Sequence, residues 1–187
     1  FTYETYAREA RRVGIATSLH MEVDVDAGQI EAETAYVEAT AKRPGATIAG
    51  AISSCRPEDD GFAAFLERQR ANPFVKGFRR VLHVMPDELS DSARFRENLK
   101  RLNGTGLTFD LCVFPRQHGH ALELIDLAPD VQFVLGLLAG RERAASRRDE
   151  RPIAGAVQIA VGQYVAELLD HRSVTRGDRE SAFQCRG

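Results

Sequence analysis

The sequence predicts an α/β protein, a partial (β/α)8 TIM-like barrel with about five parallel strand–helix units. Short apolar runs rich in β-forming residues alternate with amphipathic helical stretches through the first three-quarters of the 187 residues. Each cycle takes roughly 28 residues, which favours right-handed βαβ crossovers and a parallel sheet. A complete barrel needs about 250 residues, so we expect the C-terminal units to be missing or altered.

The first two strand–helix units follow an opening helix, Thr5–Val13, which Gly14 ends because glycine accepts the left-handed conformation that closes a helix. Thr17–Val25 alternates apolar and polar residues, as a strand with two unlike faces does. Thr47–Ile52 is almost wholly apolar, as in a strand covered on both faces. Each strand precedes a stretch with apolar residues at helical spacing, and these two predicted helices are Ile30–Lys42 and Phe62–Arg70.

The same cycle then repeats. The third predicted strand, Val75–His83, precedes a helix over Ser92–Leu102. The fourth, Thr108–Phe114, is stopped by a proline and precedes a helix over His120–Ala128, which also ends before a proline. Val131–Leu135 is the fifth strand.

The residues directly after Leu135, 136–155, differ in composition, with dense arginine, no lysine and no β-like run. We therefore divide the chain into a partial barrel, 1–135, and an atypical arginine-rich tail, 136–187, with one possible helix over 156–170. The chain also opens without Met and moves directly into a helical pattern, so we expect a fragment.

Charge and cysteine content exclude several classes of partner. The net charge of -2 gives no electrostatic case for nucleic acid, and no apolar run is long enough to span a membrane. The three cysteines, Cys55, Cys112 and Cys185, have neither disulfide-framework nor zinc-site spacing. We expect a cytoplasmic protein that binds a small molecule, with Cys55 and Cys112 as buried fillers. A homo-oligomer remains possible.

Reactive groups of a parallel barrel lie at the C-terminal ends of its strands. His20 and Glu22 alternate with the apolar residues of the first strand, so they are candidates for acid–base catalysis at the barrel mouth. The alternative is an edge strand with one solvated face. Asp110, inside the fourth strand, needs a partner such as an arginine from a neighbouring strand.

Arginines supply the candidate substrate-binding groups. Arg79 and Arg80 are adjacent in a strand, so only one can face the barrel interior, where it would bind an anionic group; its neighbour would pair with an acidic residue on a helix. His83 and Arg116 follow strand ends and complete the predicted substrate-binding set. The commoner role for His83 is capping or solvent contact. His118 and His120 form an H-x-H pair, but they fit a helix start better than a metal site, and we predict no metal ligands.

Four segments carry a family resemblance: IAGAIS, NPFVKGFRRVLH, GLTFDLCVFPRQ and LELIDLAPDVQFVL. In this order and spacing they resemble the amidohydrolase-2 branch of the amidohydrolase superfamily, which includes pyrone dicarboxylate lactonase and sugar lactonases. The resemblance covers about Tyr3 to Leu135. It implies a barrel that hydrolyses lactones or related ring bonds, with Arg79 at the place of the family's substrate-binding arginine and His20 at a polar position of the mouth. Some members bind a divalent metal such as zinc and others bind none, so the cofactor stays open.

The sequence departs from the family at two places. The family's H-x-H on the first strand would lie before Phe1, and the Asp-His-Cys-Gly motif expected after Leu135 reads Gly136, Leu137, Leu138, Ala139. We hypothesise that an out-of-frame stretch begins near Leu135, which the other reading frames of the encoding DNA would test. The expected function is a lactonase-like hydrolase; the alternatives are a catalytically inactive fragment and a small-molecule binding module.

Overall fold

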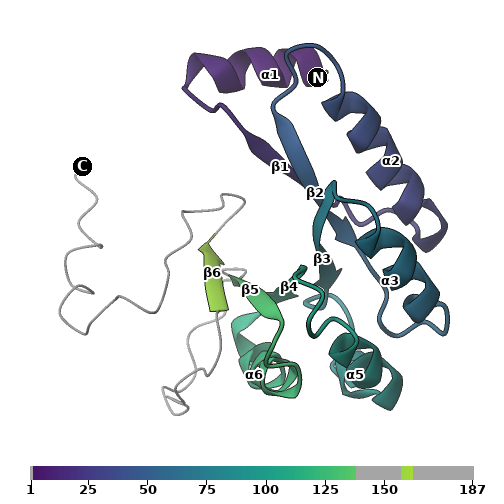
Figure 1. Cartoon of the computed structure of the whole chain (residues 1–187). Coiled ribbons are helices and arrows are strands. Elements are labelled where there is room, and N and C mark those ends of the chain that lie inside the picture. The colour runs from purple at the N-terminus through teal and green to yellow at the C-terminus, as the bar shows by residue number, and fades with distance from the viewer. Residues whose placement is uncertain (1, 138–156, 162–187) are drawn as a thin grey trace, which may run out of the picture.

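The computed structural model describes residues 2–137 and 157–161. They form one curled, parallel six-stranded sheet whose strands pair in chain order (Figure 1). Every neighbouring pair is parallel, so the partial α/β barrel predicted from the sequence is confirmed. The strands are β1 (Ser18–Met21), β2 (Ile48–Ser54), β3 (Val75–Val81), β4 (Thr108–Val113), β5 (Gln132–Leu137) and β6 (Val157–Val161).

Helices α2, α3, α5 and α6 lie along the same side of the sheet, as crossover helices must (Figure 1). Helix α1 lies instead at the end where the strands begin: the Tyr3 hydroxyl accepts a hydrogen bond from the Thr47 N–H at 2.7 Å, directly before β2. The helices are α1 (Tyr3–Arg12), η1 (Ala27–Gln29), α2 (Ile30–Ala41), α3 (Phe62–Arg70), α4 (Glu88–Asp91), α5 (Ala93–Lys100), η2 (Pro115–Gln117) and α6 (His118–Leu127). In the described part of the chain, none of these helices has the length and apolarity to cross a membrane.

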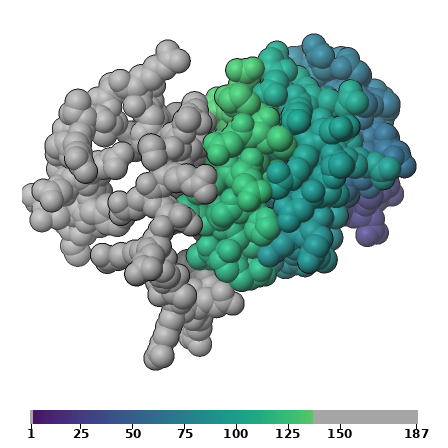
Figure 2. All heavy atoms as spheres, turned by 90° about the horizontal axis from the view of Figure 1, so that it is seen from below, coloured from purple at the N-terminus to yellow at the C-terminus, as the bar shows by residue number. Residues whose placement is uncertain are grey.

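The hydrophobic core fills the space between the sheet and these helices. Five phenylalanines dominate it, and neighbouring strands pack them against one another, as Phe109 of β4 and Phe133 of β5 do in an edge-to-face pair at 6.0 Å. Figure 2 shows the described residues as one continuous body, with the later units in green beside the earlier ones. The five fully buried rings belong to Phe62, Phe78, Phe95, Phe109 and Phe133.

The strand register assigns each side chain to one of two faces. Phe78 of β3 is in register with Phe109, and Phe109 with Phe133, so this row faces the helices. The next row is Arg79 with Asp110, and it must face the barrel interior because successive side chains of a strand point to opposite faces. The two adjacent arginines of β3 are therefore separated by the sheet.

A glycine permits the closest approach between two strands. A Cβ on Gly77 of β3 would lie 2.0 Å from Oγ1 and 2.7 Å from the carbonyl oxygen of Thr108 on β4. No side chain fits there, so Gly77 fixes the β3–β4 pairing in this register.

The first strand is shorter than predicted. It ends at Met21 instead of Val25, and Asp24 then adopts a left-handed conformation with φ of +52°, which no strand residue can hold. The Glu33 side chain of α2 accepts the Val23 N–H at 3.1 Å, so a helix replaces the neighbouring strand as hydrogen-bond partner.

The helix predicted over 156–170 is wrong at Val157–Val161, which forms β6. Apolar residues at helical spacing favoured a helix, but the edge of β5 offers backbone groups that a parallel strand satisfies. Residues 162–170, and most of the predicted arginine-rich tail, lie outside the described residues. The short helix α4 was not predicted at all.

Candidate active site

Five polar side chains gather on the interior face and at the C-terminal ends of strands β1, β3 and β4. We name them the inner cluster. Arg79 is central, and the cluster extends from the segment after β1 to the residues that follow β3. Its members are Glu22, Arg79, His83, Asp110 and Cys112.

Arg79 links the cluster through its guanidinium group. Its Nε lies 3.8 Å from Oε1 of Glu22, and its Nη2 lies 3.3 Å from Sγ of Cys112. The side chain is 24% exposed, so the group remains accessible from one side. Nε is buried without a hydrogen-bond partner among the described residues, which leaves one strong donor unused.

Glu22 is a buried carboxylate held in place by its own loop. Its Oε2 accepts the N–H of Asp24 at 2.6 Å, and the left-handed backbone of Asp24 aims that N–H. Arg56, after β2, fixes Asp24 by an ion pair at 3.1 Å. Burial raises the pKa of Glu22, although the Asp24 N–H and the charge of Arg79 oppose the rise.

Asp110 lies on β4 directly opposite Arg79 and is only 7% exposed. Its Oδ1 has no hydrogen-bond partner in the described part of the chain. Burial raises the pKa of Asp110 to about 7, against the attraction of Arg79, and the charge of Glu22 raises it further. A pKa in this range suits a carboxyl group to acid–base chemistry near neutral pH.

Cys112 and His83 complete the cluster at the strand ends. Sγ of Cys112 lies 3.5 Å from Nδ1 of His83, and burial lowers the pKa of the imidazole. The His83 ring packs edge-on against Phe114 at 5.1 Å, and the guanidinium of Arg116 lies over the same ring at 5.6 Å. His83 and Arg116 therefore share one end of the site through an aromatic ring.

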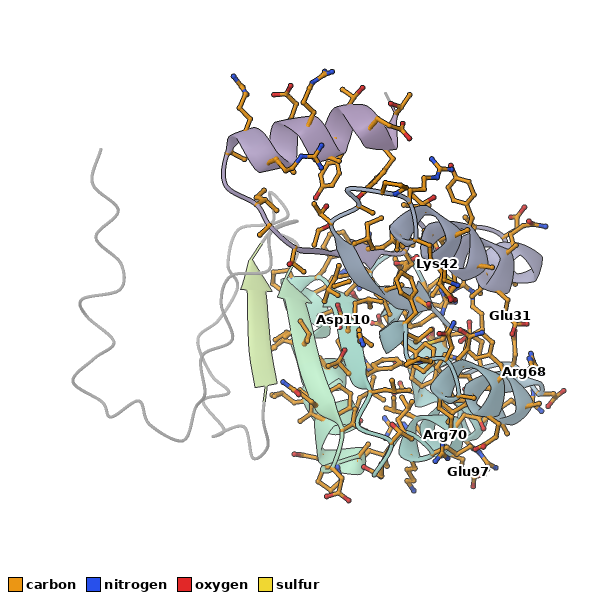
Figure 3. All side chains as sticks on the ribbon, turned by 45° about the horizontal axis from the view of Figure 1, so that its top comes forward. Glu31, Lys42, Arg68, Arg70, Glu97 and Asp110 are labelled. Atoms are coloured by element: carbon orange, nitrogen blue, oxygen red, sulfur yellow. The ribbon has the colours of Figure 1, made fainter. Side chains whose placement is uncertain are left out.

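His20 and Arg80 lie on the opposite face of the sheet. Nε2 of His20 contacts Oε1 of Glu33 on α2 at 2.9 Å, and Arg80 forms a buried ion pair with Glu58. The structure thus does not bring His20 together with Glu22, because β1 ends between them and Glu22 no longer follows the alternation of the strand. His20 and Arg80 thus connect the sheet to the layer of helices and loops outside it, and other ion pairs connect the helices to one another. In Figure 3, Asp110 lies in the sheet while Glu31 and Arg68 lie at the outer helices, where they pair at 3.0 Å.

The inner cluster does not fit a divalent metal. No group of three or more His, Cys, Asp or Glu side chains among the described residues has the arrangement of a metal site. The guanidinium of Arg79 lies between Glu22 and Cys112, where its positive charge takes the place of a cation.

Two members of the cluster were not among the predicted site residues. Asp110 was recognised only as an aspartate in need of a partner, and Cys112 as a filler. The signal that could have found them is the alternation of β4, in which Asp110 and Cys112 share one phase while Phe109, Leu111 and Val113 share the other.

A curled parallel sheet with helices along one side and polar groups at the C-terminal ends of its strands defines a partial barrel of the α/β class. The chain belongs to the amidohydrolase family, whose model, described as Amidohydrolase, matches residues 2–166. This range supports the resemblance to the amidohydrolase-2 branch and runs beyond Leu135, where the resemblance was expected to end. Among curated proteins, none matches the chain.

Solved structures show the same fold at low sequence identity. An amidohydrolase from Burkholderia multivorans matches in two crystal forms, one with bound HEPES (19% identity, TM-score 0.61) and one with bound zinc (18%, 0.62). Amidohydrolase 2 from Bifidobacterium longum subsp. infantis matches at 18% identity and a TM-score of 0.53. Each match covers 73% of this chain but only 46%, 46% and 49% of the solved chain. The chain therefore spans about half the length of these relatives.

Proposed function

We propose that this chain belongs to a hydrolase that opens a lactone or a similar cyclic ester of a small anionic substrate. One observation carries the proposal: Arg79 faces the barrel interior at the catalytic ends of the strands, partly exposed, with Nε lacking a partner in the described structure. A guanidinium binds carboxylates and oxyanions through paired donors, so an accessible one is suited to an anionic ester.

The two carboxyl groups beside Arg79 supply the acid–base chemistry of the proposal. Water would attack the ring carbonyl, and Arg79 would stabilise the negative charge that develops on the carbonyl oxygen. Asp110 or Glu22 would take the proton of the water, since both groups have a pKa raised towards neutrality by burial. Returning that proton to the ring oxygen would complete the opening of the ester.

His83 and Arg116 would contribute to substrate binding at the mouth. They meet on the ring of Phe114, at the end of β4, and the side chain of Arg116 is 49% exposed. A substrate with a second negative group would place it there. His20 and Arg80 are left out of the proposed site because both are engaged on the helix-facing side.

Turnover of a panel of sugar and dicarboxylate lactones by the full chain tests this function, with Arg79→Ala and Arg79→Lys as variants. Removing one stabilising donor from a developing oxyanion lowers kcat by about 100-fold to 1,000-fold, so we expect a loss of this size for Arg79→Ala and a smaller one for Arg79→Lys. Lys76→Ala, an exposed change on the same strand, is the control. Turnover that survives Arg79→Ala would exclude the proposed site. Binding of the substrates without turnover would favour the small-molecule binding module.

A further inference from the structure

Cys112 has the surroundings of a nucleophile. Its thiol faces the barrel interior at the C-terminal end of β4, with Nδ1 of His83 at 3.5 Å and Nη2 of Arg79 at 3.3 Å. A proton acceptor on one side and a fixed positive charge on the other are the two neighbours that assist a thiol in attack.

Burial favours the uncharged forms of both groups in the resting pair: it raises the pKa of Cys112 and lowers the pKa of His83. A neutral imidazole can accept the thiol proton at the moment of attack, and Arg79 then stabilises the thiolate as it forms. The pair therefore acts through general-base assistance and needs no standing thiolate.

An independent observation points to a ligand beside this thiol. Asp110 lies two residues before Cys112 on the same face of β4 and is more than nine-tenths buried, yet its Oδ1 has no partner among the described residues. The atom Nε of Arg79, on the adjacent strand, is likewise buried without a hydrogen-bond partner among these residues. Two unused polar atoms on one buried surface indicate a place for a polar ligand.

We propose that Cys112 is a nucleophilic residue that captures small carboxylate-bearing electrophiles bound by Arg79. In the covalent step, the thiol proton moves to Nδ1 of His83, the sulfur forms a bond to the electrophilic carbon, and the leaving group departs with its bonding electrons. With a 2-halo carboxylate the leaving group is halide, and the imidazolium returns its proton to water. The carboxylate stays within reach of the guanidinium, because the sulfur itself lies 3.3 Å from Nη2.

Cys55 is a matched reference within the same chain. It is also a buried free cysteine, directly after β2, but the hydrogen bond of its thiol goes to the backbone carbonyl oxygen of Arg79, at 3.7 Å. Among the described residues, its sulfur forms no hydrogen bond with an imidazole or a guanidinium, although the charges of Arg80 and Arg56 act on it from a distance. Burial raises the pKa of Cys55 strongly, and this thiol lacks the assistance given to Cys112.

The test is alkylation of the folded full chain with iodoacetate and, separately, with iodoacetamide, followed by peptide mapping that resolves the three cysteines. The two reagents transfer groups of similar size, but only iodoacetate carries a carboxylate. We expect Cys112 to react at least about tenfold faster than Cys55, and its preference for iodoacetate over iodoacetamide to exceed that of the urea-unfolded chain by about tenfold.

Variants separate the two assisting groups. Arg79→Gln should abolish the preference for iodoacetate while slow alkylation by iodoacetamide persists, and His83→Asn should slow both reagents. Lys76→Gln removes one positive charge from the same strand outside the cluster and should change neither rate. Equal reactivity of Cys55 and Cys112, or no reagent preference at Cys112, would overturn the proposal. This proposal rests on the proposed function because both depend on Arg79. The alkylation test, however, measures the mass of an adduct and not turnover. Loss of lactone turnover and loss of alkylation are therefore separate results.

Discussion

The two faces of the sheet use the same residue type in opposite ways. Arg80 faces the helices, where its side chain is 6% exposed and its guanidinium is bound by Glu58. Arg79, one residue earlier, faces the interior, is 24% exposed and keeps an unused donor. The helix-facing rows carry aromatic rings and satisfied ion pairs, whereas the interior row carries polar atoms without partners. The helix-facing side of the sheet therefore contributes most to stability, and the interior side carries the groups that are free to bind a ligand.

Replacing a helix-facing ring should give the largest loss of stability. Phe78 is fully buried, so Phe78→Ala leaves a cavity and should lower the free energy of unfolding by about 3–5 kcal/mol. The interior-facing Val134 is only partly buried, and Val134→Ala should cost about 1 kcal/mol. Urea denaturation of both variants measures the difference. Similar losses would show that the interior face supports the fold as much as the core does.

The two arginines of β3 give the second comparison. Arg80→Ala leaves Glu58 largely buried and unpaired, so it should lower the free energy of unfolding by about 3 kcal/mol. Arg79→Ala removes a long contact to Glu22, which keeps the Asp24 N–H, and a contact to the sulfur of Cys112, and should cost about 1 kcal/mol. Thermal and urea unfolding at one pH compare the two. A larger loss for Arg79→Ala would make that residue structural.

The pH dependence of stability sharpens the contrast further. The pKa of Asp110 is raised from 3.8 to about 7, so the folded chain binds a proton that the unfolded chain releases. Stability should therefore fall as pH rises from about 4 to 7, by at most about 1.4 kcal/mol per pH unit from this group. Asp110→Asn mimics the protonated acid and should reduce that slope. Urea denaturation across this pH range measures the slope of unfolding free energy against pH for both proteins. Identical slopes would show that the pKa of Asp110 is not raised.

The sequence predicted the sheet well because each strand's pattern is local. Phe62–Arg70 matches α3 at both ends, and β3 and β4 begin at the predicted residues, since apolar runs and stop signals determine these elements. The opposite placement of Arg79 and Arg80 also followed from alternation alone.

The errors arise where distant contacts decide the structure. β1 ends early because Glu33 of α2 binds the backbone of Val23, and this contact turns Glu22 away from the face of His20. β6 forms because β5 offers an edge, although the apolar spacing of the longer segment favoured a helix. Asp110 and Cys112 became site candidates only once the register placed them beside Arg79. The pairing between strands determines which side chains become neighbours, and the sequence of a single segment does not predict this.

The strand order, which follows the chain from β1 to β6, has a consequence for how the protein is assembled. Each unit docks only on the one made before it, so the sheet can grow from its N-terminal edge while the ribosome is still adding residues. Contacts between units then span short separations in the chain, which favours rapid folding.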